Sequence, residues 1–310
     1  MWKISVLCLG LSLTLGACSD DGGAATAPDG AVADTGGGAD GGSSCFEGKV
    51  EPSTWITVKA GTYTIGSPQQ EPCRDDDEDS LQVTLSTDFE ISAKEVTQAQ
   101  YQALMGENPA FHSGCADCPV EFVSWHEAAA YCNALSSAKK LGACYRCSGC
   151  GAAARCEKVA DCDGYRLPTE AEWEIAARGG ADSAYTSGAV TSSASFCMGT
   201  DGNLGKVGWY KVNSGGETHP AGAKAANALG LYDMEGNVYE WTDDWYTADR
   251  GAGPLTDPRG PASGSERAFR GGSWYHNAHH ARLANRERFS PDKRFVFLGF
   301  RCVRSLGGDV

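Results

Sequence analysis

The residues most able to do chemistry lie in one segment near the C-terminus, between Arg270 and Cys302. Three histidines in it, His276, His279 and His280, are spaced so that one helical turn would bring them together. Imidazole is a ligand for copper, iron and zinc, and it can take up or release a proton near neutral pH. The pattern therefore predicts either a redox-metal centre at these histidines or a polar surface that holds no metal.

Aromatic and arginine side chains surround these histidines in the sequence. Trp274 and Tyr275 follow a double glycine, which lets the backbone approach its neighbours closely. Arginines beside aromatic rings stack on them or make forked bonds to carboxylates, and both residue types suit binding grooves. The candidate residues of a groove for a peptide or a glycan are Trp274, Tyr275, His276, His279, His280, Arg282 and Arg286.

Three capping boxes predict the helices that position this segment. A Ser or Thr followed three residues later by Glu or Gln occurs at Thr97, Ser124 and Thr169, and each pattern is typical of a helix start. The helix after Thr97 is expected to run through Met105. Gly179 and the glycine after it are expected to stop the third helix.

The remaining chain is expected to hold brief strands and long loops. The pattern from Trp55 to Ile65 predicts a hairpin that turns at Gly61, and alternation over 81–91 predicts one strand. The acidic run Asp75–Asp79 is expected to be a solvated loop. Short helices separated by glycine-rich loops predict a single irregular α+β domain of low secondary-structure content.

Cysteine usage points to an oxidising compartment. Of the 14 cysteines, Cys8 and Cys18 lie in the N-terminal segment, and the other twelve read as a disulfide framework. Five of these fall in 144–162, which is expected to be a disulfide-stapled insertion. Two alternatives are a zinc site at Cys144, Cys147 and Cys150 with Cys156 or Cys162, and a redox-active pair at Cys115 and Cys118.

The N-terminus predicts export and a lipid anchor. Residues 1–17 have the apolar core of a signal peptide, and Leu15-Gly16-Ala17-Cys18 resembles the bacterial lipobox, in which the cysteine is lipidated. Residues 18–44 are mostly Gly, Ala and Asp and predict a flexible tether to a domain over 45–310. The expected location is the outer membrane, the periplasm or the cell surface.

The overall charge restricts the partners. The formal net charge is −14, which would repel a phosphate backbone and makes nucleic acid an unexpected partner. Apart from the lipid at Cys18, the sequence predicts no membrane contact, since no segment after the signal peptide has about 20 consecutive apolar residues.

Several motifs occur in a fixed order along the chain. They are EVT at 95–97, PVEFVSW at 119–125, YRLPTEAEWE at 165–174, GLYDM at 230–234, GNVYEW at 236–241, RGGSW at 270–274 and LGFRC at 298–302. Together they resemble the formylglycine-generating enzyme (sulfatase-modifying factor) family over about residues 55–304. The resemblance implies a single compact domain whose fold is a variant related to C-type lectin-like folds.

The resemblance also shows what is missing from the catalytic segment. Members of that family oxidise a sulfatase cysteine to formylglycine, using two cysteines that bind copper(I) a few residues after the Gly-Gly-Ser-aromatic turn. Counted from the glycines, these positions fall at His276 and at Ala281, or near Ala278 if the loop is shortened, and no cysteine occurs between Cys197 and Cys302. Copper(I) prefers thiolates, so the oxidase reaction is not expected here.

A calcium site of the family maps onto residues that are present. Its ligands are a side chain, two backbone carbonyls and a glutamate, and these positions match Asp233, Gly236, Val238 and Glu240. Calcium binds hard oxygens, which fits this set. The alternative is that Asp233 and Glu240 cap loops or pair with an arginine such as Arg286 or Arg301.

Two functions follow from these observations. The first is a lipid-anchored binding or scaffold module that keeps the fold and has lost the oxidase centre. The second is a metal-dependent oxidoreductase, with non-haem iron or copper at His276, His279 and His280. The two functions differ in whether the three histidines converge on a metal or belong to a surface.

Overall fold

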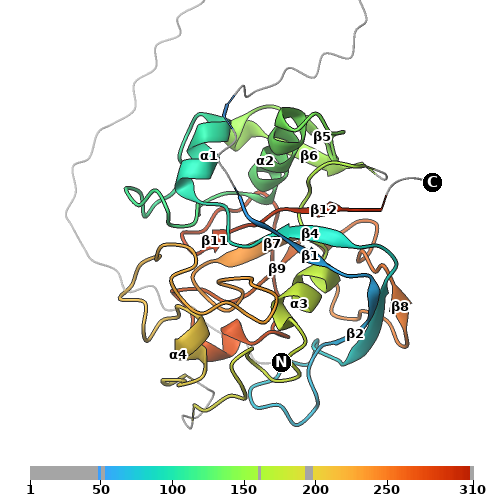
Figure 1. The fold of residues 1–310 in the computed structure, drawn as a ribbon, viewed down its shortest axis with the longest axis vertical. Coiled ribbons are helices and arrows are strands. Elements are labelled where there is room, and N and C mark those ends of the chain that lie inside the picture. The colour runs from blue at the N-terminus through green and yellow to red at the C-terminus, as the bar shows by residue number, and fades with distance from the viewer. Residues whose placement is uncertain (1–47, 50–52, 160–161, 193–197, 308–310) are drawn as a thin grey trace, which may run out of the picture. The chain divides into compact units, whose positions relative to one another are not determined.

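Four small sheets and four α-helices, the last of them the four-residue α4 (Leu204–Val207), form the framework of the described part of the domain (Figure 1). The computed structural model describes residues 48–49, 53–159, 162–192 and 198–307. The predicted signal peptide, Cys18 and the tether lie outside the described residues. Residues 42–310 form one unit, in agreement with the predicted single domain.

Two sheets carry the N- and C-terminal strands of the domain. In the first, β4 (Phe89–Ser92) lies between β1 (Trp55–Val58) and β12 (Val303–Ser305), and both pairs are antiparallel. In the second, β3 (Leu81–Leu85) lies between β2 (Gly61–Ile65) and β8 (Leu255–Thr256). The first and the last strand of the described chain, β1 and β12, therefore lie in one sheet on either side of β4.

The other two sheets frame the C-terminal segment and the insertion. The larger has the order β10 (Glu287–Phe289), β9 (Arg267–Arg270), β7 (Tyr239–Trp245) and β11 (Leu298–Gly299). The smaller pairs β5 (Tyr145–Ser148) with β6 (Arg155–Lys158). Strands β9, β10 and β11 all come from the segment of interest or its immediate start, so this sheet fixes both ends of that segment.

Two strand predictions are wrong. β1 pairs with β4 and β2 pairs with β3, so the stretch around Gly61 joins two sheets and is not a hairpin. The expected single strand over 81–91 is two strands, because the chain turns between β3 and β4. Asp88 fixes that turn by accepting hydrogen bonds from the Ala60 N–H and the Lys59 ammonium, at 2.7 and 2.8 Å.

The three helix starts are confirmed. α1 (Gln98–Met105), α2 (Trp125–Ala138) and α3 (Glu170–Arg178) each begin after a complete capping box at Thr97, Ser124 and Thr169. α3 ends at Gly179, whose φ of 53° is left-handed. Figure 1 shows α1 and α2 together with the β5–β6 pair, whereas α3 lies against strands of the sheets.

Two apolar cores hold these elements together. One packs α1 and α2 against β7, β9 and β11 and contains Trp125 and Trp241, which are fully buried. The other packs α3 against β2, β3 and β4 around Trp173 and Val83. Each buried Trp side chain contributes several kcal/mol on the scale of core truncations, about 3–5. The site segment therefore starts and ends in a rigid framework.

The disulfide framework is confirmed for eight of the twelve cysteines and is wrong for Cys132 and Cys302, whereas Cys45 and Cys197 lie outside the described residues. Disulfides join Cys115 to Cys118, Cys144 to Cys162 and Cys147 to Cys156, and Cys73 and Cys150 are also disulfide-bonded. The zinc alternative is therefore excluded, since a disulfide sulfur has no thiolate to give to a metal. Cys132 and Cys302 are buried thiols whose sulfurs lie 3.0 Å apart.

Within the described residues, no helix combines the length and the apolar character needed to cross a membrane.

Candidate functional site

The double glycine brings the start of the segment against its own continuation. Gly271 and Gly272 have φ angles of 103° and 73°, which favour glycine. A side chain at Gly272 would lie 2.7 Å from the Cα atom of Ala281, in the short helix η3 (Ala278–Ala281). A side chain at Gly271 would lie 3.1 Å from the ring of Trp173. The turn thus holds Ala281, where the resemblance places the family's second cysteine, in a buried contact with the backbone of Gly272.

His276 is a neutral, partly buried imidazole. Its Nδ1 atom is hydrogen-bonded to the Ser273 hydroxyl at 2.7 Å, and its ring packs on Tyr239 and Phe297, at centroid distances of 5.0 and 4.6 Å. Burial, together with the nearby His280 and His279 rings, lowers the pKa of His276 to about 3. At neutral pH the ring is uncharged and can donate or accept a hydrogen bond. It cannot supply the thiolate that a cysteine at this position would give to copper(I).

The three histidine rings are neighbours without forming a metal centre. The His276 and His280 rings are 5.2 Å apart, and those of His279 and His280 are 4.0 Å apart. The Nδ1 atom of His280 lies 3.1 Å from a carboxylate oxygen of Glu287. Throughout the described part of the chain, no three or more His, Cys, Asp or Glu side chains are arranged to hold a metal. The redox-metal alternative therefore gains no support from the geometry.

A row of aromatic rings, here called the aromatic strip, passes beside His276. We define it as seven rings in contact: Phe289, Phe295, Phe297, Tyr275, Trp274, His112 and Phe111. Successive centroids along this order are 4.7, 5.0, 5.8, 5.4, 4.8 and 5.3 Å apart. Phe111, Tyr275 and Phe289 are 67%, 54% and 40% exposed. Large contiguous apolar patches on a protein surface often belong to contact sites, so the strip is a candidate binding surface.

Two of the predicted groove residues belong to this strip, and most of its members were not predicted. Trp274 is buried, donates its indole N–H to the carbonyl of Val296 at 3.0 Å and supports the exposed Tyr275. Phe295 and Phe297 belong to the apolar run over 295–300, a pattern typical of a core, but they are only half-buried. No local signal separates them from core residues, because Phe295, Val296 and Phe297 are all apolar and all half-buried.

Arg282 and Arg286 do not face a groove. Arg282 is fully buried and makes a forked pair with Glu78, at 2.7 and 2.6 Å, and a further bond to Glu71. Arg286 makes a forked pair with Glu170, at 2.7 and 2.8 Å. Both guanidinium groups are therefore fully engaged within the fold, and we remove both arginines from the set of ligand contacts.

These pairs also correct the interpretation of the acidic run. Asp75 and Asp76 are exposed, but Glu78 is buried and accepts bonds from Arg282 and from the Ser67 hydroxyl. Two arginines of the site segment thus bind the loop before β3 and the start of α3. Paired buried charges fix a geometry that apolar contacts alone would leave looser.

The residues assigned to calcium lie in a buried, acidic part of the fold. Asp233 and Glu95 are buried, and burial raises the pKa of both, to about 6 for Asp233 and well above its usual value for Glu95. Glu240 is fully buried between Arg301, which donates to both of its oxygens at 2.6 and 2.7 Å, and the indole N–H of Trp173. One arginine thus faces three carboxylates.

This cluster fits a calcium ion in part. The Asp233 Oδ1 atom is buried and has no hydrogen-bond partner in the described structure, so it could serve as a ligand. Gly236 has a φ of 118°, and a side chain at this position would lie 2.3 Å from the carbonyl oxygen of Trp209. The backbone can therefore curve tightly here, as a loop that directs carbonyl oxygens at a cation requires. Glu240 has fewer free lone pairs, because Arg301 and Trp173 use three acceptor positions.

Comparison with known proteins agrees with this architecture. The model of the sulfatase-modifying factor enzyme 1-like domain matches residues 45–306. The chain is 33% identical over 259 residues to the chaperone protein LppX of Paenibacillus barcinonensis, covering 72% of this chain and 82% of that protein. It is 41% identical over 157 residues to the formylglycine-generating enzyme of Thermomonospora curvata, covering 45% of this chain and 49% of that enzyme. It thus spans about half the length of that relative.

Solved structures give the same result. Treponema denticola variable protein 1 superposes with a TM-score of 0.70 and 34% identity, covering 81% of this chain and 95% of that one. PvdO from Pseudomonas aeruginosa superposes with a TM-score of 0.63 and 25% identity, covering 81% and 94%. The chain therefore belongs to the sulfatase-modifying factor enzyme 1-like domain family.

Proposed function

We propose that this domain is a binding module that holds a protein or peptide partner on the aromatic strip and does not generate formylglycine. The observation that carries the proposal is the strip itself: seven rings in contact, three of them exposed, beside His276, one of the two positions where the resemblance places the family's catalytic cysteines. Aromatic side chains dominate the energetics of protein interfaces.

The orientation of the rings favours a peptide over a glycan. Phe297 stacks nearly parallel between Phe295 and Tyr275, with interplanar angles of 11° and 14°. Ring faces in the middle of the strip are therefore covered by other rings, and the edges remain for a ligand. A sugar ring packs best on an open aromatic face, whereas apolar side chains pack well against edges.

The position of the domain in the cell forms part of the proposal. A lipid at Cys18 and the 18–44 tether would hold the strip away from the membrane surface, free to meet a partner. One relative is named a chaperone, a name that suits a protein whose work is to hold other proteins. We propose the same class of role here, carried out by an exported, anchored protein.

The proposed function predicts two results on the purified protein. Incubation with a cysteine-containing sulfatase peptide and copper(I) yields no aldehyde by a hydrazide probe, while a formylglycine-generating enzyme run in parallel yields it. Panning of a phage-displayed random peptide library enriches peptides, and the double variant Tyr275→Ala/Phe297→Ala weakens their binding at least tenfold, since central aromatic contacts carry about 2 kcal/mol or more each.

The matched control is Leu229→Ala, which truncates another partly exposed apolar side chain, away from the strip. It is expected to bind the selected peptides as the unmodified protein does. Aldehyde formation, or equal peptide binding by the double variant, would contradict the proposal. Binding to an immobilised glycan array in place of peptides would overturn the choice of partner.

A calcium ion at Asp233, Gly236, Val238 and Glu240 is a second part of the proposal. Added calcium is expected to raise the melting temperature of protein first treated with a chelator, because a ligand that binds only the folded state stabilises it. Asp233→Asn removes one ligand charge while tolerating the left-handed φ of 58°. It should shift the calcium dependence to higher concentration, whereas Asp292→Asn should leave it unchanged. An identical melting temperature with and without calcium would contradict the site.

A further inference from the structure

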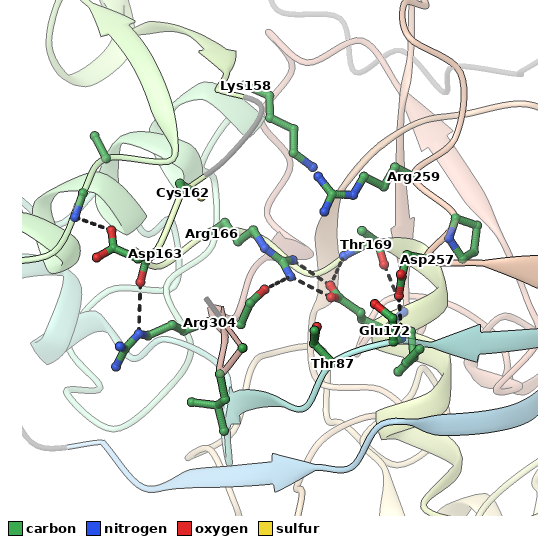
Figure 2. Close-up of a pocket in the computed structure, with 18 residues that line it drawn as sticks. Thr87, Lys158, Cys162, Asp163, Arg166, Thr169, Glu172, Asp257, Arg259 and Arg304 are labelled. Carbon is green, nitrogen blue, oxygen red and sulfur yellow. Dashed lines mark hydrogen bonds and ion pairs between the residues drawn. The ribbon is translucent and has the colours of Figure 1, made fainter. Parts of the chain in front are cut away.

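A cleft lies between the disulfide-stapled insertion and the loop after β8 (Figure 2). Its volume is about 900 Å³, within the range of sites for small molecules. Its walls come from β6, the start of α3, the loop at Asp257–Arg259 and the end of β12. None of the seven strip residues lines it. We propose that this cleft binds a small molecule that carries an oxyanion group, such as a phosphate, sulfate or carboxylate.

The acidic side chains of the walls are engaged within the fold. Glu172 accepts a forked pair from Arg166, at 2.6 and 2.7 Å. An Asp163 oxygen accepts the Gly142 N–H at 2.7 Å, and an Asp257 oxygen accepts the Ser86 N–H at 2.9 Å. Each carboxylate therefore has a bound donor, which offsets part of its repulsion toward an incoming anion.

Three basic side chains of the walls keep donors to spare. Arg304 uses its Nε–H for the Asp163 carbonyl at 3.0 Å, and one of its terminal nitrogens lies 3.8 Å from Glu90. Lys158 contacts Asp243 through one of its three N–H groups. Arg259 is exposed at the mouth, and Figure 2 shows Lys158 and Arg259 extending toward each other.

Lys158 is paired with the buried Asp243, and Arg259 extends toward Lys158, so an anion between the two would be attracted by both cations. Guanidinium forks match the geometry of phosphate and carboxylate oxygens. The chain as a whole is acidic, with a formal net charge of −14, so a cleft with spare cations differs from its surroundings. Charge and geometry therefore favour an anionic ligand at this place.

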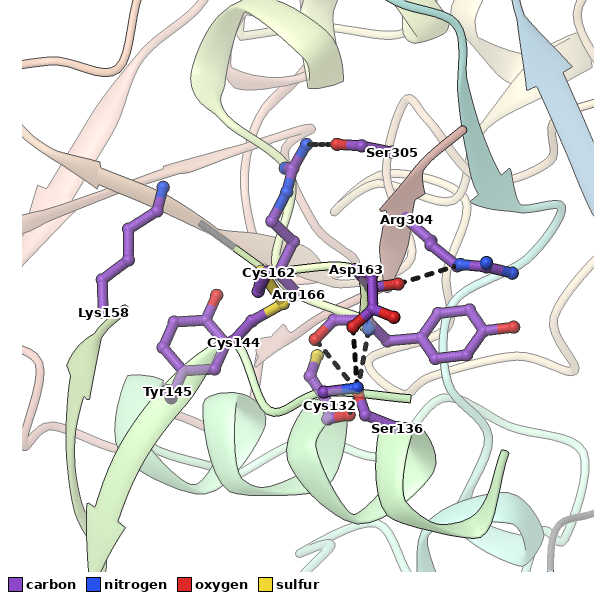
Figure 3. Close-up of a disulfide and its surroundings, with 12 residues drawn as sticks. Cys132, Ser136, Cys144, Tyr145, Lys158, Cys162, Asp163, Arg166, Arg304 and Ser305 are labelled. Atoms are coloured by element: carbon purple, nitrogen blue, oxygen red, sulfur yellow. Dashed lines mark hydrogen bonds between the residues drawn. A yellow bond between two sulfur atoms is a disulfide. The ribbon is translucent and has the colours of Figure 1, made fainter. Parts of the chain in front are cut away.

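The walls are held in position before any ligand arrives. The Cys144–Cys162 disulfide fixes Asp163 beside the end of α2 (Figure 3). Arg166 donates to the Ser305 hydroxyl at 2.9 Å and so ties the end of β12 to the same wall. A pre-organised site binds more tightly, because less freedom is lost on binding.

The test is isothermal titration of the purified protein with inorganic phosphate, sulfate and citrate, at constant ionic strength set with chloride. Saturable binding of at least one of these anions is expected. Arg259→Ala and Arg304→Ala should each weaken it at least tenfold. Arg259→Lys, which keeps the charge and loses the fork, should fall between the unmodified protein and Arg259→Ala.

The matched control is Lys206→Ala, which removes an exposed cation outside the cleft. It should leave the affinity within twofold. The cleft proposal is overturned if no anion gives saturable binding, or if Lys206→Ala weakens binding as much as Arg259→Ala does, since that result would show general charge screening. Preference for citrate over phosphate would assign a carboxylate ligand, and the reverse a phosphorylated one.

Discussion

Replacing Arg270 with methionine is expected to lower the free energy of unfolding by about 3 kcal/mol or more. Arg270 is fully buried and donates to Glu170 at 2.9 Å, to Glu174 at 2.7 Å and to the carbonyl of Leu283 at 2.6 Å. Arg270 and neighbouring arginines lower the pKa of Glu174 to about 2, and they also lower the pKa of Glu170. Removing Arg270 leaves both carboxylates buried with less positive charge around them.

Urea denaturation at pH 7, followed by tryptophan fluorescence, measures this loss. The control is Arg155→Met, since Arg155 and its partner Asp292 are 57% and 54% exposed at the side chain. An exposed pair contributes about 0–1 kcal/mol, so this variant should remain close to the unmodified protein. Equal losses in the two variants would show that the buried arginine network does not stabilise the fold more than a surface pair does.

The Arg270 network also shows which features the sequence could predict. The capping boxes at Thr97, Ser124 and Thr169 were predictable, because each depends on residues three positions apart and on nothing distant. The order of family motifs was predictable for the same kind of reason, since each motif is local. The buried pairs were not, because Glu78 and Arg282 are far apart in the sequence and an acidic run reads as solvated until its partner is known.

Strand pairing and the aromatic strip escaped prediction for a related reason. The alternation over 81–91 gives the faces of an extended chain but not its partner or its interruption at Asp88. Residue type alone does not show whether Phe295 and Phe297 lie in a core or on a surface. Only the position of β11, which buries the residues after Phe297, decides between the two. The cleft at Arg259 and Arg304 left no local signal at all, because its walls come from five separate parts of the chain.

Raising the pH from 5 to 8 is expected to destabilise the protein, and Asp244→Asn is expected to remove a large part of that effect. Asp244 is buried at the end of β7 and accepts the backbone N–H of Glu170 at 2.7 Å. Burial raises the pKa of Asp244 to about 8, and the charge of Glu170 adds to the shift. The unfolded value is about 3.9, so between these pH values the folded carboxyl holds a proton that the unfolded one has released.

The sign follows from that difference. A carboxyl with a raised folded pKa contributes its full stability below the unfolded pKa and loses it as the pH rises through the folded pKa. The loss is about 1.4 kcal/mol per pH unit, or on the order of 4 kcal/mol between pH 5 and 8. Glu121, whose pKa burial raises to about 7, acts in the same direction. Glu174, with a pKa of about 2, loses stability only as the pH falls below its unfolded value, outside this range.

Urea denaturation at pH 5, 6, 7 and 8, at fixed ionic strength, measures the slope. Asparagine keeps the side-chain oxygen that accepts from Glu170 but cannot ionise, so the slope in Asp244→Asn should be shallower by up to one proton. Asp292→Asn is the matched control, because the Asp292 side chain is 54% exposed and water solvates it in both states. Parallel slopes in the unmodified protein and in Asp244→Asn would show that Asp244 does not carry a proton in the folded state. The pH dependence of stability would then have to come from other buried carboxyl groups, such as Glu121.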